Sequence, residues 1–141
     1  MPLWLGLAIV SMACAQGLLA QQPAVVGSEP VAARPEDLEF FESQVRPIFV
    51  EHCSECHTRK LDGREAGEPE GGLSFDSRSD FRASEGVAVA GNPEKSLIVQ
   101  VIRYDGELQM PPAGKLPAGA IATLEEWVRR ELPWPDDGTT A

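Results

Sequence analysis

Three residues able to bind a cofactor fall within one short stretch, Cys53-Ser54-Glu55-Cys56-His57. On a helical turn, positions i, i+3 and i+4 project from the same face. Cys53, Cys56 and His57 can therefore meet one flat molecule. The spacing C-x-x-C-H is the attachment signature of a c-type haem. It predicts one haem c, bound covalently through thioether bonds from Cys53 and Cys56 to its vinyl groups, with His57 as the proximal iron ligand.

Two other interpretations of this stretch remain open at the level of the residues. One is a redox-active dithiol or disulfide with an uninvolved histidine, and the other is a partial zinc site. Closed zinc sites need four ligands, which this stretch does not supply. The third cysteine, Cys14, lies in the expected leader, so no further thiol remains for a structural disulfide. This count of cysteines favours the haem interpretation.

A methionine supplies the candidate for the opposite side of the iron. Met1 and Met12 belong to the expected leader, which leaves Met110 in the stretch Gln109-Met110-Pro111-Pro112. A thioether is a soft, neutral ligand that suits haem iron and raises its reduction potential. The two prolines restrict the backbone around it. We expect Met110 to be the distal ligand; the alternative is a loop methionine packed against the core.

The first 20 residues resemble a secretory leader. An apolar run over residues 3–10 is followed by small residues, with cleavage expected after Ala15 or Ala20, although no Lys or Arg precedes the run. An uncleaved anchor and a lipid-modified Cys14 are the alternatives. We expect an exported protein, periplasmic or otherwise extracytoplasmic, with no membrane contact beyond this leader.

The remaining chain is predicted to be one all-α domain. Residues 21–34 have the composition of a linker, residues 35–135 form the domain, and residues 136–141 form a tail. Apolar residues recur at helical spacing, and Pro47 predicts an interruption of the first helix near 44–46. We expect three to four helices wrapped around the haem, joined by long loops. The helical segments are expected from Pro35 to the cysteine stretch, as one turn at 77–81, from Asn92 to Tyr104, and from Ala118 to Leu132.

The charge of the chain limits its partners. Asp and Glu number 22 against 12 Lys and Arg, which gives a net charge of -10. Nucleic-acid binding calls for clustered basic residues, so it is not expected. An acidic surface favours a redox partner, either a separate protein or an attached catalytic domain, that carries a basic docking patch.

Over about residues 38–135 the chain resembles the planctomycete-type cytochrome c domain, a monohaem class I c-type cytochrome. The matching stretches are 41–57 with its Arg46-Pro47, Gly71-Gly72-Leu73 with Asp76-Ser77-Arg78, 91–97, Met110-Pro111-Pro112 and Leu124-Glu125-Glu126-Trp127. The resemblance implies His57/Met110 ligation and electron transfer. Two features depart from the family: its domain usually opens a much longer chain, and it tends to place a glycine-containing turn where this chain has Arg130-Glu131-Leu132.

The predicted function is electron transfer, by a free-standing carrier or by the redox domain of a larger system, and not catalysis. The alternative is a haem enzyme or sensor with an open or labile distal site, although no distal His, Arg or acid suggests itself. We expect His57 to donate its second ring N–H to a carbonyl in the loop around Pro69. Arg78, Arg103 and Tyr104 are candidates for contact with the haem propionates.

Overall fold

The computed structural model describes residues 33–61, 64–65 and 67–135. The expected leader, most of the expected linker and the expected tail lie outside these residues. The domain boundaries at 20, 34 and 135 therefore stay predictions.

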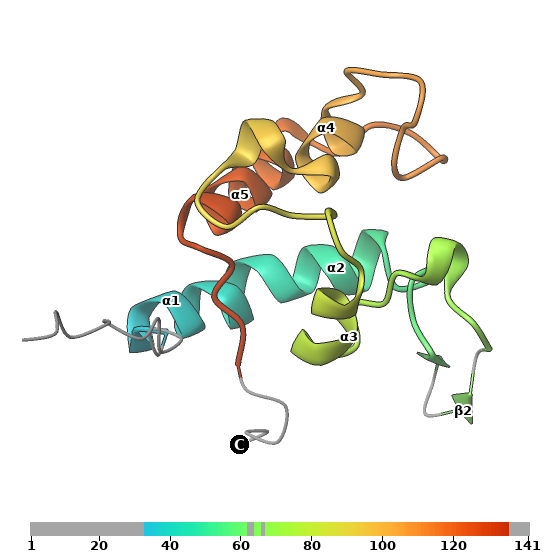
Figure 1. The fold of residues 1–141 in the computed structure, drawn as a ribbon, viewed down its shortest axis with the longest axis horizontal. Coiled ribbons are helices and arrows are strands. Elements are labelled where there is room, and N and C mark those ends of the chain that lie inside the picture. Colours follow the sequence, from blue (N-terminus) through green and yellow to red (C-terminus); the bar gives the residue numbers. More distant parts are fainter. Residues whose placement is uncertain (1–32, 62–63, 66, 136–141) are drawn as a thin grey trace, which may run out of the picture. The chain divides into compact units, whose positions relative to one another are not determined.

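The first helical segment runs without a break toward the cysteine stretch. It consists of α1 (Pro35–Phe40), a π-helical turn η1 (Phe41–Val45) and α2 (Arg46–His52), which follow one another in helical backbone conformation (Figure 1). Pro35 opens the segment, where its missing N–H costs nothing, and Glu36 and Asp37 suit the positive end of the helix. The expected interruption at 44–46 is thus a wider turn ahead of Pro47, not a break. Pro47 has no N–H to donate to the preceding turn, and the wider π turn accommodates the absence of this hydrogen bond.

Short elements occupy the middle of the chain. Two-residue strands β1 (Lys60–Leu61) and β2 (Arg64–Glu65) pair antiparallel, and a 3-10 turn η2 (Glu70–Gly72) follows. The predicted helical turn is α3 (Arg78–Ala83), with the Ser77 hydroxyl accepting from the N–H of Asp80 at 3.0 Å. The Asn92 side chain accepts from the N–H of Lys95, as expected of an N-cap, but the helix expected from Asn92 to Tyr104 is not continuous. The 3-10 turn η3 (Pro93–Lys95) is followed by Ser96 in extended conformation, with φ -89° and ψ 118°.

Two further helices complete the domain and pack against each other (Figure 1). Helix α4 (Leu97–Arg103) buries Ile98, Val99 and Ile102, and Tyr104 ends it in the left-handed conformation at φ 64°. Helix α5 (Ala118–Arg129) buries Leu124, Trp127 and Val128.

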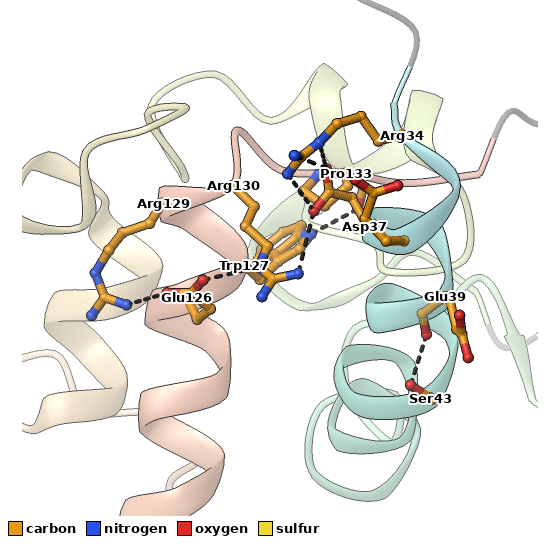
Figure 2. A network of polar contacts seen from close by, with 10 residues as sticks. Arg34, Asp37, Glu39, Ser43, Glu126, Trp127, Arg129, Arg130 and Pro133 are labelled. Atoms are coloured by element: carbon orange, nitrogen blue, oxygen red, sulfur yellow. Dashed lines mark hydrogen bonds and ion pairs between the residues drawn. The ribbon is translucent and has the colours of Figure 1, made fainter.

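The prediction that the last helix continues to Leu132 is wrong. Glu131 and Leu132 have φ values of 68° and 59°, so the chain leaves the helix after Arg129 and turns back. The Leu132 N–H donates to the Trp127 carbonyl, and the Trp127 indole N–H donates to the carbonyl of Pro133 at 2.9 Å (Figure 2). This turn brings Trp134 into the core, 4% exposed. It forms without the glycine that the resemblance led us to expect.

An aromatic cluster forms the centre of the domain. Trp127 contacts Phe41, Phe49 and Phe81, with ring centroids 5.3 to 6.3 Å apart, and Trp134 stacks on Phe49 and Phe81. The cluster joins the first helical segment, α3 and α5 in one core, because each contributes at least one ring. The predicted all-α fold is confirmed; β1 and β2 add only a two-residue ladder.

Among the described residues, no helix is long and apolar enough to cross a membrane.

Candidate haem-attachment site

The three residues that opened the sequence analysis lie in one hydrogen-bonded turn at the end of α2. The Cys53 N–H donates to the carbonyl of Phe49, and the His57 N–H donates to the carbonyl of Cys53, both at 2.9 Å. The second bond spans four residues, as in a helical turn. The structure therefore brings Cys53, Cys56 and His57 together, as the spacing predicts.

The two cysteines differ in environment. Cys53 is half-buried and packs against the aromatic core, whereas Cys56 is exposed, and neither is in a disulfide. Burial raises the pKa of the Cys53 thiol to about 12. Because the thiolate is the nucleophile in disulfide exchange, a thiol that stays protonated is a poor redox catalyst. This environment counts against the interpretation as a redox-active dithiol.

The interpretation as a zinc site gains no support either. Within the described part of the chain, no group of three or more His, Cys, Asp or Glu side chains is arranged to hold a metal ion.

The imidazole of His57 is oriented by a backbone carbonyl. Its Nδ1 lies 3.1 Å from the oxygen of Leu73, and its ring meets the ring of Phe75 edge-on at 5.8 Å. A carbonyl only accepts, so Nδ1 carries a proton, and in the neutral imidazole the free electron pair is then on Nε2. This is the usual arrangement of a metal-ligating histidine. The acceptor lies four residues beyond Pro69, the position around which we expected it.

The segment 70–76, which we call the proximal strap, crosses the turn. The Glu70 N–H donates to the carbonyl of Cys56 and the Phe75 N–H to the carbonyl of His57, both at 2.9 Å. Gly71 and Gly72 both have positive φ values, 65° and 73°, which glycine adopts without strain. Nothing in the spacing of the cysteine stretch alone pointed to the strap, because it approaches from 13 to 19 positions later in the chain.

Met110 lies in the loop between α4 and α5 and is half-buried against the core. Its N–H donates to the carbonyl of Val101 at 3.1 Å, and the hydroxyl of Tyr104 donates to the carbonyl of Pro111. The peptide bond between Met110 and Pro111 is cis. Two hydrogen bonds thus attach this loop to α4 on either side of the Met110–Pro111 bond.

All three propionate candidates take part in interactions within the protein. Tyr104 anchors the Met110 loop, and the guanidinium of Arg103 pairs with Glu94 at 2.9 Å and Glu125 at 2.7 Å. These ion pairs make Arg103 a link between η3, α4 and α5. Arg78 is half-buried at the first residue of α3.

A hollow of about 410 Å³ lies beside α4. Val101, whose carbonyl holds Met110, contributes to its wall, together with Leu97 and Leu108, which are 41% and 53% exposed. Its other lining residues are Gln100, Asp105, Gly106 and Glu107. The described residues thus leave large apolar side chains uncovered next to the Met110 loop.

The groups at the turn fit a haem c. Two free thiols lie within one turn, one half-buried against the core and one exposed, beside an imidazole whose Nε2 electron pair is not used by Leu73. These features, on an all-α domain, are those expected of a c-type cytochrome.

The comparison with known families agrees. Residues 53–114 match the model of the Planctomycete cytochrome C family, so this part of the chain is similar to the domains of that family. The match begins at Cys53 and includes Met110. It is narrower than the resemblance over residues 38–135. Neither the curated proteins nor the solved structures contain a match to the chain. The match supports a covalently bound haem c and an electron-transfer module in preference to a catalytic enzyme.

Proposed function

We propose that this protein transfers single electrons through one haem c attached to Cys53 and Cys56, with His57 and Met110 as the axial ligands. The observation that carries the proposal is the hydrogen bond from His57 Nδ1 to the Leu73 carbonyl. This bond assigns the free electron pair of the neutral imidazole to Nε2, in a histidine that follows two free thiols within one turn.

Each residue has a separate task in this proposal. Cys53 and Cys56 hold the cofactor at two points, and His57 presents Nε2 in a fixed orientation because Leu73 accepts its other proton. The bound haem supplies the one-electron chemistry. Cys53 belongs to the same apolar packing as Phe49, so the attachment point is coupled to the rigid core.

The proposal that Met110 is the distal ligand is supported by the hydrogen bonds that hold its loop. The bonds from Met110 to Val101 and from Tyr104 to Pro111 restrict the position of the thioether. A restricted ligand limits the reorganisation that accompanies a change of charge at a metal. The soft sulfur would also keep the reduction potential higher than a harder donor would.

The negative net charge supports the proposal of a partner with a basic docking patch. The net charge of -10 attracts a redox protein or an attached catalytic domain whose docking patch carries Lys and Arg. We place the cytochrome domain at residues 35–135, after a leader and linker. The proposed location is outside the cytoplasm, where c-type cytochromes of this family generally function.

The decisive experiment compares spectra of the wild type and the Met110→Ala variant, both expressed with cytochrome c maturation machinery. We expect covalent haem in both, and loss of the sulfur-to-iron charge-transfer band with a fall in reduction potential in Met110→Ala. Gln109→Ala, in the same loop, is the control and should keep the band.

Three results would contradict parts of the proposal. Absence of covalent haem in the wild type would contradict the attachment site. An unchanged band in Met110→Ala would contradict the distal ligand. A wild-type haem without a sixth protein ligand would favour the alternative, an enzyme or sensor with an open distal site.

A further inference from the structure

Asp76 lies in the proximal strap and contacts the chain directly after His57. Its Oδ1 accepts a hydrogen bond from the hydroxyl of Thr58, and its Oδ2 accepts from the backbone N–H of Arg59 at 2.6 Å. One carboxylate thus holds two consecutive residues that follow the proposed iron ligand. Hydrogen bonds to a charged acceptor are about twice as strong as neutral ones.

Thr58 is buried, at 4% exposed, and its hydroxyl both donates and accepts a hydrogen bond. Its hydroxyl oxygen accepts from the N–H of Lys60 at 3.0 Å, so the single hydroxyl proton is available to Asp76. The carbonyl of Lys60 also lies within reach of this hydroxyl, but a carboxylate is the stronger acceptor. Thr58 therefore connects the strap to the turn through a partly buried bond.

The strap itself continues from Asp76 back to the histidine. Phe75 donates its N–H to the carbonyl of His57, and Leu73 accepts the proton of His57 Nδ1. The N–H of Asp76 is in turn held by the hydroxyl of Ser74 at 3.2 Å, and Ser74 is 1% exposed. Movement of the Leu73 carbonyl is therefore limited at one end by the anchor that Asp76 provides.

We propose that Asp76, through Thr58, is a positioning residue for His57: it holds the strap so that the Leu73 carbonyl stays within hydrogen-bond distance of Nδ1. This inference rests on the proposed role of His57 as iron ligand. A strong bond at Nδ1 makes the imidazole a better electron donor at Nε2. Better donation stabilises the oxidised iron, so a weakened anchor raises the reduction potential.

The test uses the haem-loaded protein and two measurements. The first is the rate at which the His57 Nδ1 proton exchanges with solvent, followed by NMR of the reduced protein. The second is the reduction potential. Thr58→Val removes the hydroxyl and keeps the shape and burial of the side chain. We expect its Nδ1 proton to exchange about fivefold faster, the factor that corresponds to the loss of one typical hydrogen bond. We expect its potential to be higher.

Three control variants separate positioning from charge and from general loosening. Thr58→Ser keeps the hydroxyl and should restore the wild-type exchange rate. Asp76→Ala should behave as Thr58→Val does, because it removes both of the oxygens that accept from Thr58 and Arg59. Glu70→Gln removes a charge from the same strap at an exposed side chain that takes part only through its backbone. It should leave the exchange rate at the wild-type value.

The outcomes decide the proposal separately from the proposed function. Wild-type exchange rates in both Thr58→Val and Asp76→Ala would overturn the positioning role, even with haem normally bound. A rise in potential without faster exchange, equal to that of Glu70→Gln, would assign the effect to charge alone and would overturn it too. Failure of the haem or Met110 assignment would appear instead in the spectra of the wild type and Met110→Ala.

Discussion

The guanidinium of Arg130 lies 3.3 Å from the carboxylate of Asp37, which is 93 positions earlier in the chain (Figure 2). Asp37 belongs to α1 and Arg130 directly follows α5, so this pair joins the two ends of the domain. Arg34 binds the same carboxylate at 2.7 Å, and Arg130 also binds Glu126 at 2.9 Å. The Asp37 side chain is only 7% exposed, although both of its arginine partners reach solvent.

We expect Asp37→Asn to lower the free energy of unfolding by about 1 kcal/mol, since it weakens a charged hydrogen-bond pair whose arginines are partly screened by water. Urea unfolding of the haem-loaded protein, followed by circular dichroism, measures this change. Glu39→Gln on the same helix is the control, because Glu39 is exposed and receives the Ser43 hydroxyl through its backbone carbonyl (Figure 2). A loss no larger than that of the control would contradict the role of the pair.

The same pair predicts a pH dependence. The hydrogen bond from Arg34 holds the pKa of the Asp37 carboxyl below its ordinary value of 3.8, burial opposes this effect, and the charges of Arg34 and Arg130 add to it. A carboxyl with a lowered pKa in the folded state stabilises that state above its unfolded pKa. This stability is lost as the pH falls through the folded pKa. The stability difference between wild type and Asp37→Asn should therefore be constant from pH 7 down to about 5 and shrink below pH 4. A difference that grows on acidification would refute this assignment.

The anchor of the Met110 loop gives a prediction that rests on the proposed distal ligand. Tyr104→Phe removes the hydroxyl that donates to the Pro111 carbonyl and keeps the ring. Phenylalanine is no more strained than tyrosine at the positive φ of this position. Loss of about 1 kcal/mol of anchoring should let added imidazole displace Met110 about fivefold more readily.

A spectroscopic titration with imidazole measures this affinity. Lys115→Ala, at an exposed position in the same loop, serves as the control and should bind imidazole as the wild type does. Equal affinity in Tyr104→Phe and the wild type would show that the hydroxyl does not restrain Met110.

The charge of the protein predicts how small redox reagents react with it. No charged side chain precedes Glu29, so removal of a leader would leave the net charge of -10 intact. A cationic reagent should therefore react fastest at low salt and slow as salt is added, and an anionic reagent should show the opposite trend. Both trends should be largely complete at 0.15 M, where the Debye length is about 8 Å. Stopped-flow rates with a neutral reagent provide the baseline, and identical salt dependence for all three would contradict electrostatic steering.

The features that the sequence predicted correctly depend on neighbours within one or two turns. The cysteine–histidine turn follows from the spacing of Cys53, Cys56 and His57, and the cap at Asn92 follows from a side chain that reaches an N–H three residues on. Helical periodicity likewise located the buried faces of the long helices. The end of α5 was misplaced because the turn at Glu131 and Leu132 is held by the contact of Trp127 with Pro133, which periodicity does not record.

The sequence by itself determined which groups are available for chemistry: two thiols, an imidazole and a thioether on an acidic, helical domain. Only the tertiary structure decided how they are held. Leu73 and Asp76 reach His57 and Thr58 from 16 and 18 positions away, and Arg130 reaches Asp37 from 93. Such pairs depend on the path of the whole chain. The residue types in these pairs are common in proteins, so no local sequence pattern predicts which residues will pair.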